Sequence, residues 1–161
     1  MTETFTIARH FTAPPALVWR AWTEAGLLAH WYGPGVETVI HALDVRAGGQ
    51  WLTEMKMGPN SYFQRADFTE VAPEAALSCL MSTTDADWNT IANPMMPDWP
   101  RVLRTDVTLA ATETGTDLTL VWTPHEATEA ELACFAAAKA NFGGGWGKGF
   151  DMLEEMLAKG L

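Results

Sequence analysis

The apolar positions near the end of the chain recur with the period of an α-helix. When the chain is wound at about 100° per residue, seven large side chains fall within a sector of about 80°; they are Leu132, Phe135, Phe142, Trp146, Phe150, Leu153 and Leu157. The pattern keeps its phase through the glycine run 143–145. It predicts one amphipathic helix from about residue 128 to 159, which the capping-box spacing of Thr128 and Glu131 begins.

A helix of this length needs a large apolar surface from the rest of the chain to cover its apolar stripe. At about 1.5 Å per residue it is about 45 Å long. Its apolar stripe cannot be buried against a short partner, so we expect the preceding chain to form a broad curved sheet, with a hollow between sheet and helix. Gly143 lies inside the apolar sector. Its missing side chain either lets the sheet, a ligand or another helix approach closely, or merely kinks the helix.

Most of the chain before this helix alternates between apolar and polar residues, as strands with one buried face do. Strands are expected at residues 4–11, 37–46, 50–57, 62–71, 76–83, 101–111 and 117–123. Pro15 favours a short helix after the first strand, and Thr23 and Glu24 are expected to cap a second one through Trp31. The order of elements predicts an α+β fold with a curved antiparallel sheet of about six to seven strands.

Residues 85–100 have no clear period, although they contain large apolar side chains. A connection of sixteen residues is longer than most structureless loops in compact domains. The segment is therefore expected to fold over a pocket as a lid, to pack on a second subunit of a homodimer, or to lie on the core. As a lid it would use Trp88, Met95, Met96 and Trp99.

The composition fits one globular domain over residues 1–161, with 48% hydrophobic and 19% charged residues. The formal net charge of −10 argues against nucleic acid and anionic membranes as partners. The sequence contains no apolar run of the ~18 residues that a membrane span needs, and its start does not resemble a secretion signal. Cys79 and Cys134 stand alone, so we expect two reduced thiols and a cytoplasmic location.

Patterns for catalysis are scarce. The four histidines share no ligand spacing, and the sequence predicts neither a metal site nor a cofactor site. His41 lies on an expected strand, where it is either an acid–base group of a pocket or a structural histidine. No pair of residues stands out as a catalytic pair.

The inward-facing positions of the strands and helix supply the candidate ligand-binding residues. Strand parity and helical phase place on the hollow Trp51, Met55, Tyr62, Gln64, Phe68, Cys79, Met81, Leu103, Thr105, Trp122, Lys139, Phe142 and Trp146. A largely apolar wall with a few polar points is typical of small-molecule pockets, and equally of a filled core. Lys139 either pairs with a ligand carboxylate or phenolate, or extends its charge into water at the edge of the stripe.

Several spaced motifs together resemble one known family. They are FTAPPALVWRAWT at 11–23, LLAHWYGP at 27–34, DVRAGGQW at 44–51, EVAP at 70–73 and GWGKGFDMLEEML at 145–157. Over nearly its whole length the chain resembles START-like domains of the SRPBCC superfamily, of the type homologous to the activator of the heat-shock-protein-90 ATPase. The resemblance implies a helix-grip fold, in which an antiparallel sheet curls around the long C-terminal helix and encloses a hydrophobic cavity.

Three functions follow as hypotheses. The first is binding of a small hydrophobic or aromatic molecule in the cavity. The second, from the family, is a protein that interacts with a chaperone and regulates its ATPase; the resemblance covers only the C-terminal-type domain of the two-domain activators, so stimulation of the ATPase is not expected. The third is a cyclase-like or hydrolase-like enzyme that uses the same cavity.

Overall fold

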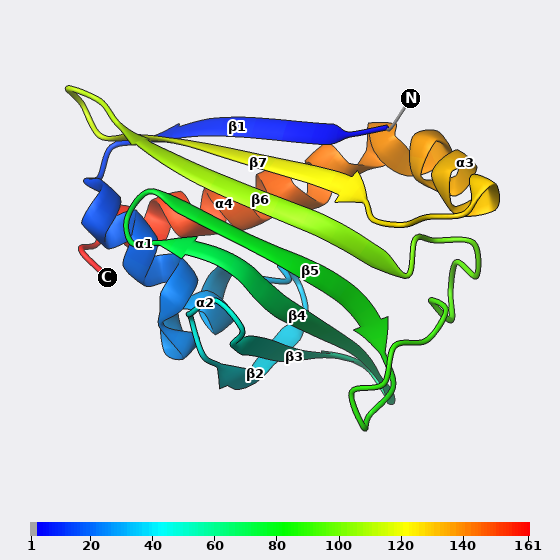
Figure 1. The fold of residues 1–161 in the computed structure, drawn as a ribbon. Coiled ribbons are helices and arrows are strands. Elements are labelled where there is room, and N and C mark those ends of the chain that lie inside the picture. Colours follow the sequence, from blue (N-terminus) through cyan, green and yellow to red (C-terminus); the bar gives the residue numbers. More distant parts are fainter. Residues whose placement is uncertain (1–2) are drawn as a thin grey trace.

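The computed structural model describes residues 3–161, and in this part of the chain seven strands form one antiparallel sheet (Figure 1). The strands are β1 (Phe5–Phe11), β2 (Glu37–Leu43), β3 (Gln50–Met57), β4 (Asn60–Ala72), β5 (Ala76–Thr84), β6 (Val102–Ala111) and β7 (Thr116–Pro124). Their order across the sheet is β1-β7-β6-β5-β4-β3-β2, which leaves β1 and β2 at the two edges. The predicted curved antiparallel sheet is confirmed.

The helices lie where the sequence places them. Two short helices follow the first strand, α1 (Pro15–Thr23) and α2 (Ala25–Trp31), and the chain ends with α3 (Glu129–Ala138) and α4 (Phe142–Ala158). Figure 1 shows α4 running along one face of the sheet, with α1 and α2 near one end of it. This is the expected α+β helix-grip arrangement. None of the helices in residues 3–161 combines the length and apolar composition that crossing a bilayer requires.

The C-terminal helical run is continuous from residue 129 to 158, with one tighter turn inside it. Its start is the predicted capping box, in which Thr128 Oγ1 accepts a hydrogen bond from the Glu131 N–H at 3.1 Å and Glu131 Oε1 accepts one from the Thr128 N–H at 3.3 Å. The tighter turn is a 3₁₀ turn, η1 (Lys139–Asn141). It precedes the glycine run 143–145, which lies inside α4.

Two local predictions are wrong. Thr23 and Glu24 do not cap α2 with their side chains, because both are engaged within α1: Thr23 Oγ1 donates to the Trp19 carbonyl at 2.7 Å, and Glu24 accepts from Arg20. Strand β2 ends at Leu43 rather than at residue 46, because the chain turns through residues 44–49 to enter β3.

The core fills one part of the space between the sheet and α4. Phe150 and Leu153 of α4 are fully buried, as are Phe11 of β1 and Leu118 of β7. The rings of Phe11 and Phe150 meet edge to face at 5.8 Å. Each large apolar side chain removed from water in this way contributes about 1.5–3 kcal/mol. The second half of α4 therefore holds the helix on the sheet with fully buried side chains, while Phe142 and Trp146 of the glycine-rich first half are only partly buried.

Residues 85–100 fold around the end of the sheet, so that different parts of the segment lie on its two faces. Its first part pairs with β5, where Thr90 bridges Thr84 and the Ile91 N–H donates to the Thr83 carbonyl at 3.0 Å. Trp88 packs on Phe63, on the face of the sheet away from α4.

Candidate functional site

Two adjoining pockets lie between the inner face of the sheet and the first half of α4. The first has a volume of about 360 Å³ and the second of about 280 Å³. Gln64 of β4, Trp122 of β7 and Phe142 of α4 line both pockets. These three side chains form the shared wall between the pockets. The first pocket falls within the range of small-molecule binding sites.

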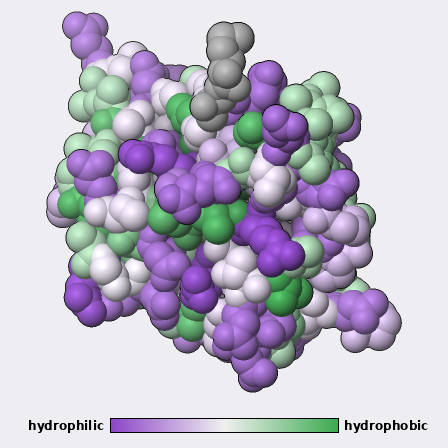
Figure 2. Space-filling model, turned by 45° about the vertical axis from the view of Figure 1, so that its right-hand side comes forward, coloured by the Kyte–Doolittle hydropathy of each residue, from purple (hydrophilic) through white to green (hydrophobic). Residues whose placement is uncertain are grey.

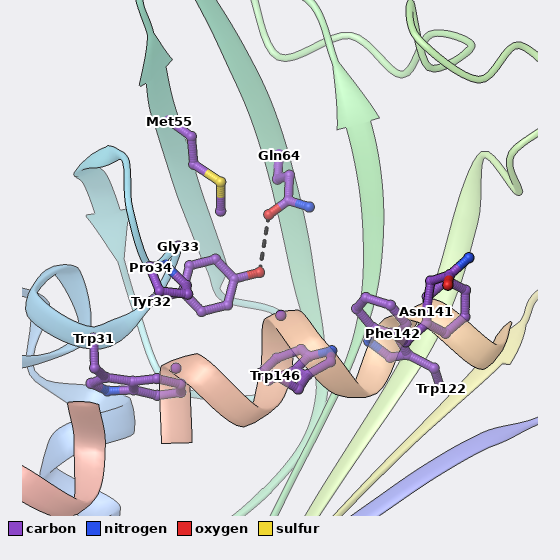
Figure 3. Close-up of a pocket in the computed structure, with 12 residues that line it drawn as sticks. Trp31, Tyr32, Gly33, Pro34, Met55, Gln64, Trp122, Asn141, Phe142 and Trp146 are labelled. Carbon is purple, nitrogen blue, oxygen red and sulfur yellow. Dashed lines mark hydrogen bonds between the residues drawn. The ribbon is translucent and has the colours of Figure 1, made fainter. Parts of the chain in front are cut away.

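The turn between α2 and β2 forms one side of the first pocket, and hydrogen bonds hold it in place (Figure 3). The Trp31 indole N–H donates to the Ala21 carbonyl at 2.9 Å, and Thr38 Oγ1 donates to the Tyr32 carbonyl at 2.7 Å. Gly33 has φ +74°, and a Cβ there would lie 2.7 Å from Thr38 Oγ1. Glycine is therefore required at the point where the turn approaches β2.

Helix α4 forms the opposite side of the first pocket, and two glycines one turn apart shape it. Both Gly145 and Gly149 line the pocket. A Cβ at Gly149 would lie 3.4 Å from the Trp31 carbonyl oxygen, in van der Waals contact, so α4 approaches the end of α2 at this glycine. A Cβ at Gly145 would meet nothing within 4 Å. Gly145 therefore leaves the pocket unobstructed on the side of α4.

Aromatic rings provide the apolar surface of the first pocket. The ring of Trp146 lies 5.5 Å from Trp122, 6.1 Å from Tyr32 and 6.3 Å from Trp22. Such pairs contribute about 0.5–1.5 kcal/mol each beyond their buried area, so the rings support one another in fixed orientations. The result is a preorganised aromatic surface on one side of the pocket.

The polar groups of the first pocket are neutral. The Tyr32 hydroxyl donates to Gln64 Oε1 at 3.0 Å, and Met81 Sδ lies 3.8 Å from the same hydroxyl. Burial raises the pKa of Tyr32 far above its usual value, so the phenol remains a donor at neutral pH. Among residues 3–161, no charged side chain lines either pocket.

The second pocket is bounded by the segment that crosses from β5 to β6. Asn93 anchors this segment, because its Nδ2 lies 3.4 Å from the Tyr62 hydroxyl and its Oδ1 accepts from the Met95 N–H at 2.9 Å. Met95 and Met96 lie at the rim and are 70% and 38% exposed. In Figure 2, which brings this end of the molecule forward, small hydrophobic patches are separated by hydrophilic residues.

The structure brings most of the sequence-predicted site residues to the two pockets. Those that line one or both are Met55, Tyr62, Gln64, Met81, Leu103, Trp122, Phe142 and Trp146, together with Met95, Met96 and Trp99 of the expected lid. Trp51, Phe68, Cys79 and Thr105 also face inward, but each is at most 3% exposed and belongs to neither lining. The inner face is therefore part pocket and part filled core.

Two predicted site residues lie away from the pockets. Lys139 Nζ lies 3.0 Å from Glu3 Oε2, in an ion pair that ties the start of the chain to η1. Trp88 lies on the outer face of the sheet, where its ring is 5.5 Å from Phe63 and its carbonyl accepts from Arg65 Nη1 at 2.8 Å. Neither residue lines the pockets.

His41 also lies on the outer face. Its Nε2 is 2.9 Å from Glu54 Oε1, and Ser61 Oγ donates to the other oxygen of the same carboxylate. The hydrogen bond from Ser61, followed by that from His41, lowers the pKa of Glu54. The carboxylate separates serine from histidine, so the histidine cannot activate the hydroxyl as a nucleophile. Within residues 3–161, no cluster of three or more His, Cys, Asp or Glu side chains could hold a metal ion.

Sequence reasoning missed the pocket residues that come from turns and from helix glycines. They are Trp31, Tyr32, Gly33, Pro34, Asn93, Pro100, Asn141, Gly145 and Gly149; Ser82 and Thr83, at the end of β5, were missed as well. Strand parity places only residues in strands, so it could not find the α2–β2 turn. The available signal was the break at residues 32–35, where a helical run stops just before an expected strand.

The chain is similar to known proteins over nearly its whole length. Residues 12–158 match the family model described as Activator of Hsp90 ATPase homolog 1-like protein. A comparison with curated proteins found no significant match.

Solved structures with the same fold include three bacterial proteins. A Mycobacterium smegmatis protein is 22% identical, with TM-score 0.78, and the match covers 100% of this chain and 98% of that one. A Nitrosomonas europaea protein is 26% identical, with TM-score 0.72 and coverage of 98% and 96%. An Arthrobacter aurescens protein is 19% identical, with TM-score 0.78 and coverage of 99% and 91%. Since the family model matches nearly all of this helix-grip domain, the chain belongs to the Activator of Hsp90 ATPase homolog 1-like family.

Proposed function

We propose that the protein binds a small hydrophobic or aromatic molecule between the inner face of the sheet and the first half of α4. The observation that carries this proposal is the first pocket, a hollow of about 360 Å³ lined by aromatic side chains and Met55, with a few neutral polar groups. An apolar surface with a small number of placed polar groups is the usual composition of a ligand site.

The glycines of α4 support the same proposal. In a helix interior, glycine is less favourable than alanine by about 0.8–1 kcal/mol. At Gly145 an alanine would meet no neighbouring atom within 4 Å, so the packing of the fold does not require glycine there. A ligand that enters between α4 and the α2–β2 turn does require that space.

A thermal-shift screen with small aromatic compounds tests the proposal. A ligand at a hundred times its Kd stabilises the folded state by about 2.7 kcal/mol. For a domain of this size that corresponds to a rise in melting temperature of roughly 5–10 °C. Gly145→Leu would fill the first pocket and should abolish the shift.

Gly144→Leu is the matched control, because Gly144 is exposed, neighbours Gly145 in the sequence and lines neither pocket. This variant should keep the wild-type shift. The proposal is contradicted if no compound in a broad aromatic library raises the melting temperature, or if Gly144→Leu and Gly145→Leu lose the shift equally.

A second candidate function follows from the family, whose description refers to activation of a chaperone ATPase. Under this proposal the protein binds the chaperone and alters its rate of ATP hydrolysis. A pull-down with the purified chaperone and a steady-state ATPase assay test it together. Retention of the protein with a changed rate would support regulation, and no retention at micromolar concentrations would contradict it.

A further inference from the structure

We propose that the ligand of the first pocket is neutral and carries a hydrogen-bond acceptor, such as a carbonyl oxygen, that accepts from Gln64 Nε2. The inference rests on the proposed binding function and specifies its ligand class. It follows from the orientation of one amide and from the charges around it.

The Tyr32 hydroxyl sets the orientation of the Gln64 amide. It donates to Gln64 Oε1 at 3.0 Å. In Figure 3 the Oε1 atom of Gln64 points to Tyr32, and Nε2 points away from it. Gln64 lines both pockets. The amide group therefore presents its donor, and not its acceptor, to the space that a ligand would occupy.

The opposite orientation of the Gln64 amide is disfavoured, because the only other hydrogen-bond partner of the Tyr32 hydroxyl in residues 3–161 is the sulfur atom of Met81. If Nε2 faced Tyr32, the phenol hydrogen would have to bind Met81 Sδ, which lies 3.8 Å from the hydroxyl. A thioether sulfur is a weak acceptor, whereas an amide oxygen is a strong one. The phenol keeps its hydrogen at neutral pH, because an ordinary tyrosine pKa is about 10 and burial raises the pKa of Tyr32 further. The tyrosine is thus a permanent donor that selects the amide oxygen.

The amide nitrogen is left available for a ligand. Residues 3–161 provide no hydrogen-bond acceptor for Gln64 Nε2, whereas Gln50, on the neighbouring strand β3, donates from its Nε2 to Asp67 Oδ1 at 3.1 Å. A donor left without a partner when an apolar ligand covers it loses its hydration. A ligand acceptor at this position removes that cost.

The charges around the pocket select against ionic ligands. Neither pocket is lined by a charged side chain. Of the two lysines close to the lining residues in the sequence, Lys139 is paired with Glu3, and Lys148 is exposed and belongs to neither lining. A carboxylate in the pocket would lose its hydration without a cation to replace it. A cation could stack on Trp146, but Gln64 turns the positive end of its amide dipole towards the hollow. A neutral acceptor satisfies both conditions.

Four naphthalene probes that differ in one substituent test the inference. They are 2-acetylnaphthalene, 2-ethylnaphthalene, 2-naphthoate and the 2-naphthyltrimethylammonium ion, and Kd is measured by quenching of tryptophan fluorescence. Comparing the ketone with the hydrocarbon in wild type and in Gln64→Met cancels their different solubilities. Methionine keeps the unbranched shape of glutamine and removes the donor.

In Gln64→Met, the ratio of the ketone Kd to the hydrocarbon Kd should rise roughly 3- to 10-fold over its wild-type value, the effect of one neutral hydrogen bond. Gln50→Met should leave the ratio unchanged, because Gln50 is exposed and outside both linings. In the wild type, both ions should bind at least about 10-fold more weakly than the ketone. If Gln64→Met does not fold, Gln64→Glu, which also replaces the amide donor, should weaken the ketone more than the hydrocarbon.

The outcomes separate this inference from the function on which it rests. If the hydrocarbon binds and the ketone ratio is the same in wild type and Gln64→Met, the ligand class is wrong while the binding function stands. Tighter binding of either ion than of the ketone also overturns the ligand class. If none of the four probes binds, the binding function itself fails.

Discussion

Replacing Gly144 with alanine is expected to make the protein more stable. The residue lies in the interior of α4, it is exposed, and a Cβ added to it would meet no atom within 4 Å. Its backbone is not among those with positive φ, so alanine adopts the same conformation without strain. The whole helix-propensity difference of about 0.8–1 kcal/mol should therefore appear as added stability.

Gly145→Ala separates stability from binding. It should stabilise the fold by the same amount, because its Cβ also meets no atom within 4 Å. The double variant Gly144→Ala/Gly145→Ala should gain about 2 kcal/mol, the sum of two helix-propensity differences. At roughly 2–4 °C per kcal/mol, its melting temperature should rise by roughly 4–8 °C. Only the variants that contain Gly145→Ala should bind the aromatic probes more weakly.

Urea denaturation followed by circular dichroism gives the free energy of unfolding, and fluorescence titration gives the Kd. Gly149→Ala is the informative contrast. This glycine is buried, and its Cβ would be in van der Waals contact with the Trp31 carbonyl oxygen at 3.4 Å, so its change in stability includes a packing contribution that Gly144→Ala lacks. A loss of stability in Gly144→Ala would refute the reasoning, because it would mean that the fold itself requires glycine in the first half of α4.

Three further outcomes are expected. Thr128→Ala removes the side-chain cap of α3 and should cost about 1 kcal/mol in urea denaturation. Under native conditions, a thiol reagent should modify Cys134 and not Cys79, because Cys79 is buried and burial raises its pKa to about 12. Cys134→Ser should abolish the reaction, which mass spectrometry measures. The hydrogen bond from Ser61 lowers the pKa of Glu54, so this carboxylate stabilises the fold at neutral pH. It loses that effect as pH falls below about 4.5, its ordinary pKa. Glu54→Gln should therefore reduce the fall in stability on acidification, measured by urea denaturation as a function of pH.

The fold could be predicted because its determinants are periodic. The helical phase of the last segment placed Phe150 and Leu153 on the sheet, where both are fully buried. Alternation along the strands turned Gln64 and Trp122 inward, where both line the pockets. A residue's face depends on local geometry alone, which a sequence pattern carries directly.

The outline of the site could be predicted only in part, because the same inward face holds pocket and core. Cys79 faces inward like Gln64, yet it is 2% exposed and lies in the filled part. Which part stays hollow depends on where α4 lacks side chains and where the α2–β2 turn meets it. That contact joins Gly149 to Trp31, residues far apart in the chain with no common period. Nor does any periodic pattern predict that parts of residues 85–100 lie on opposite faces of the sheet.

The indole N–H signals of the eight tryptophans test the central claim most directly, because each is a separate reporter in a two-dimensional NMR spectrum. Titration with 2-acetylnaphthalene should shift Trp31, Trp122 and Trp146, which line the first pocket. Trp19 and Trp88 line neither pocket and should not move. Saturable shifts confined to the pocket tryptophans and their ring neighbours are the predicted result. Shifts at Trp19 or Trp88 without shifts at Trp146, or no shifts at any tryptophan, would contradict a ligand site between the sheet and α4.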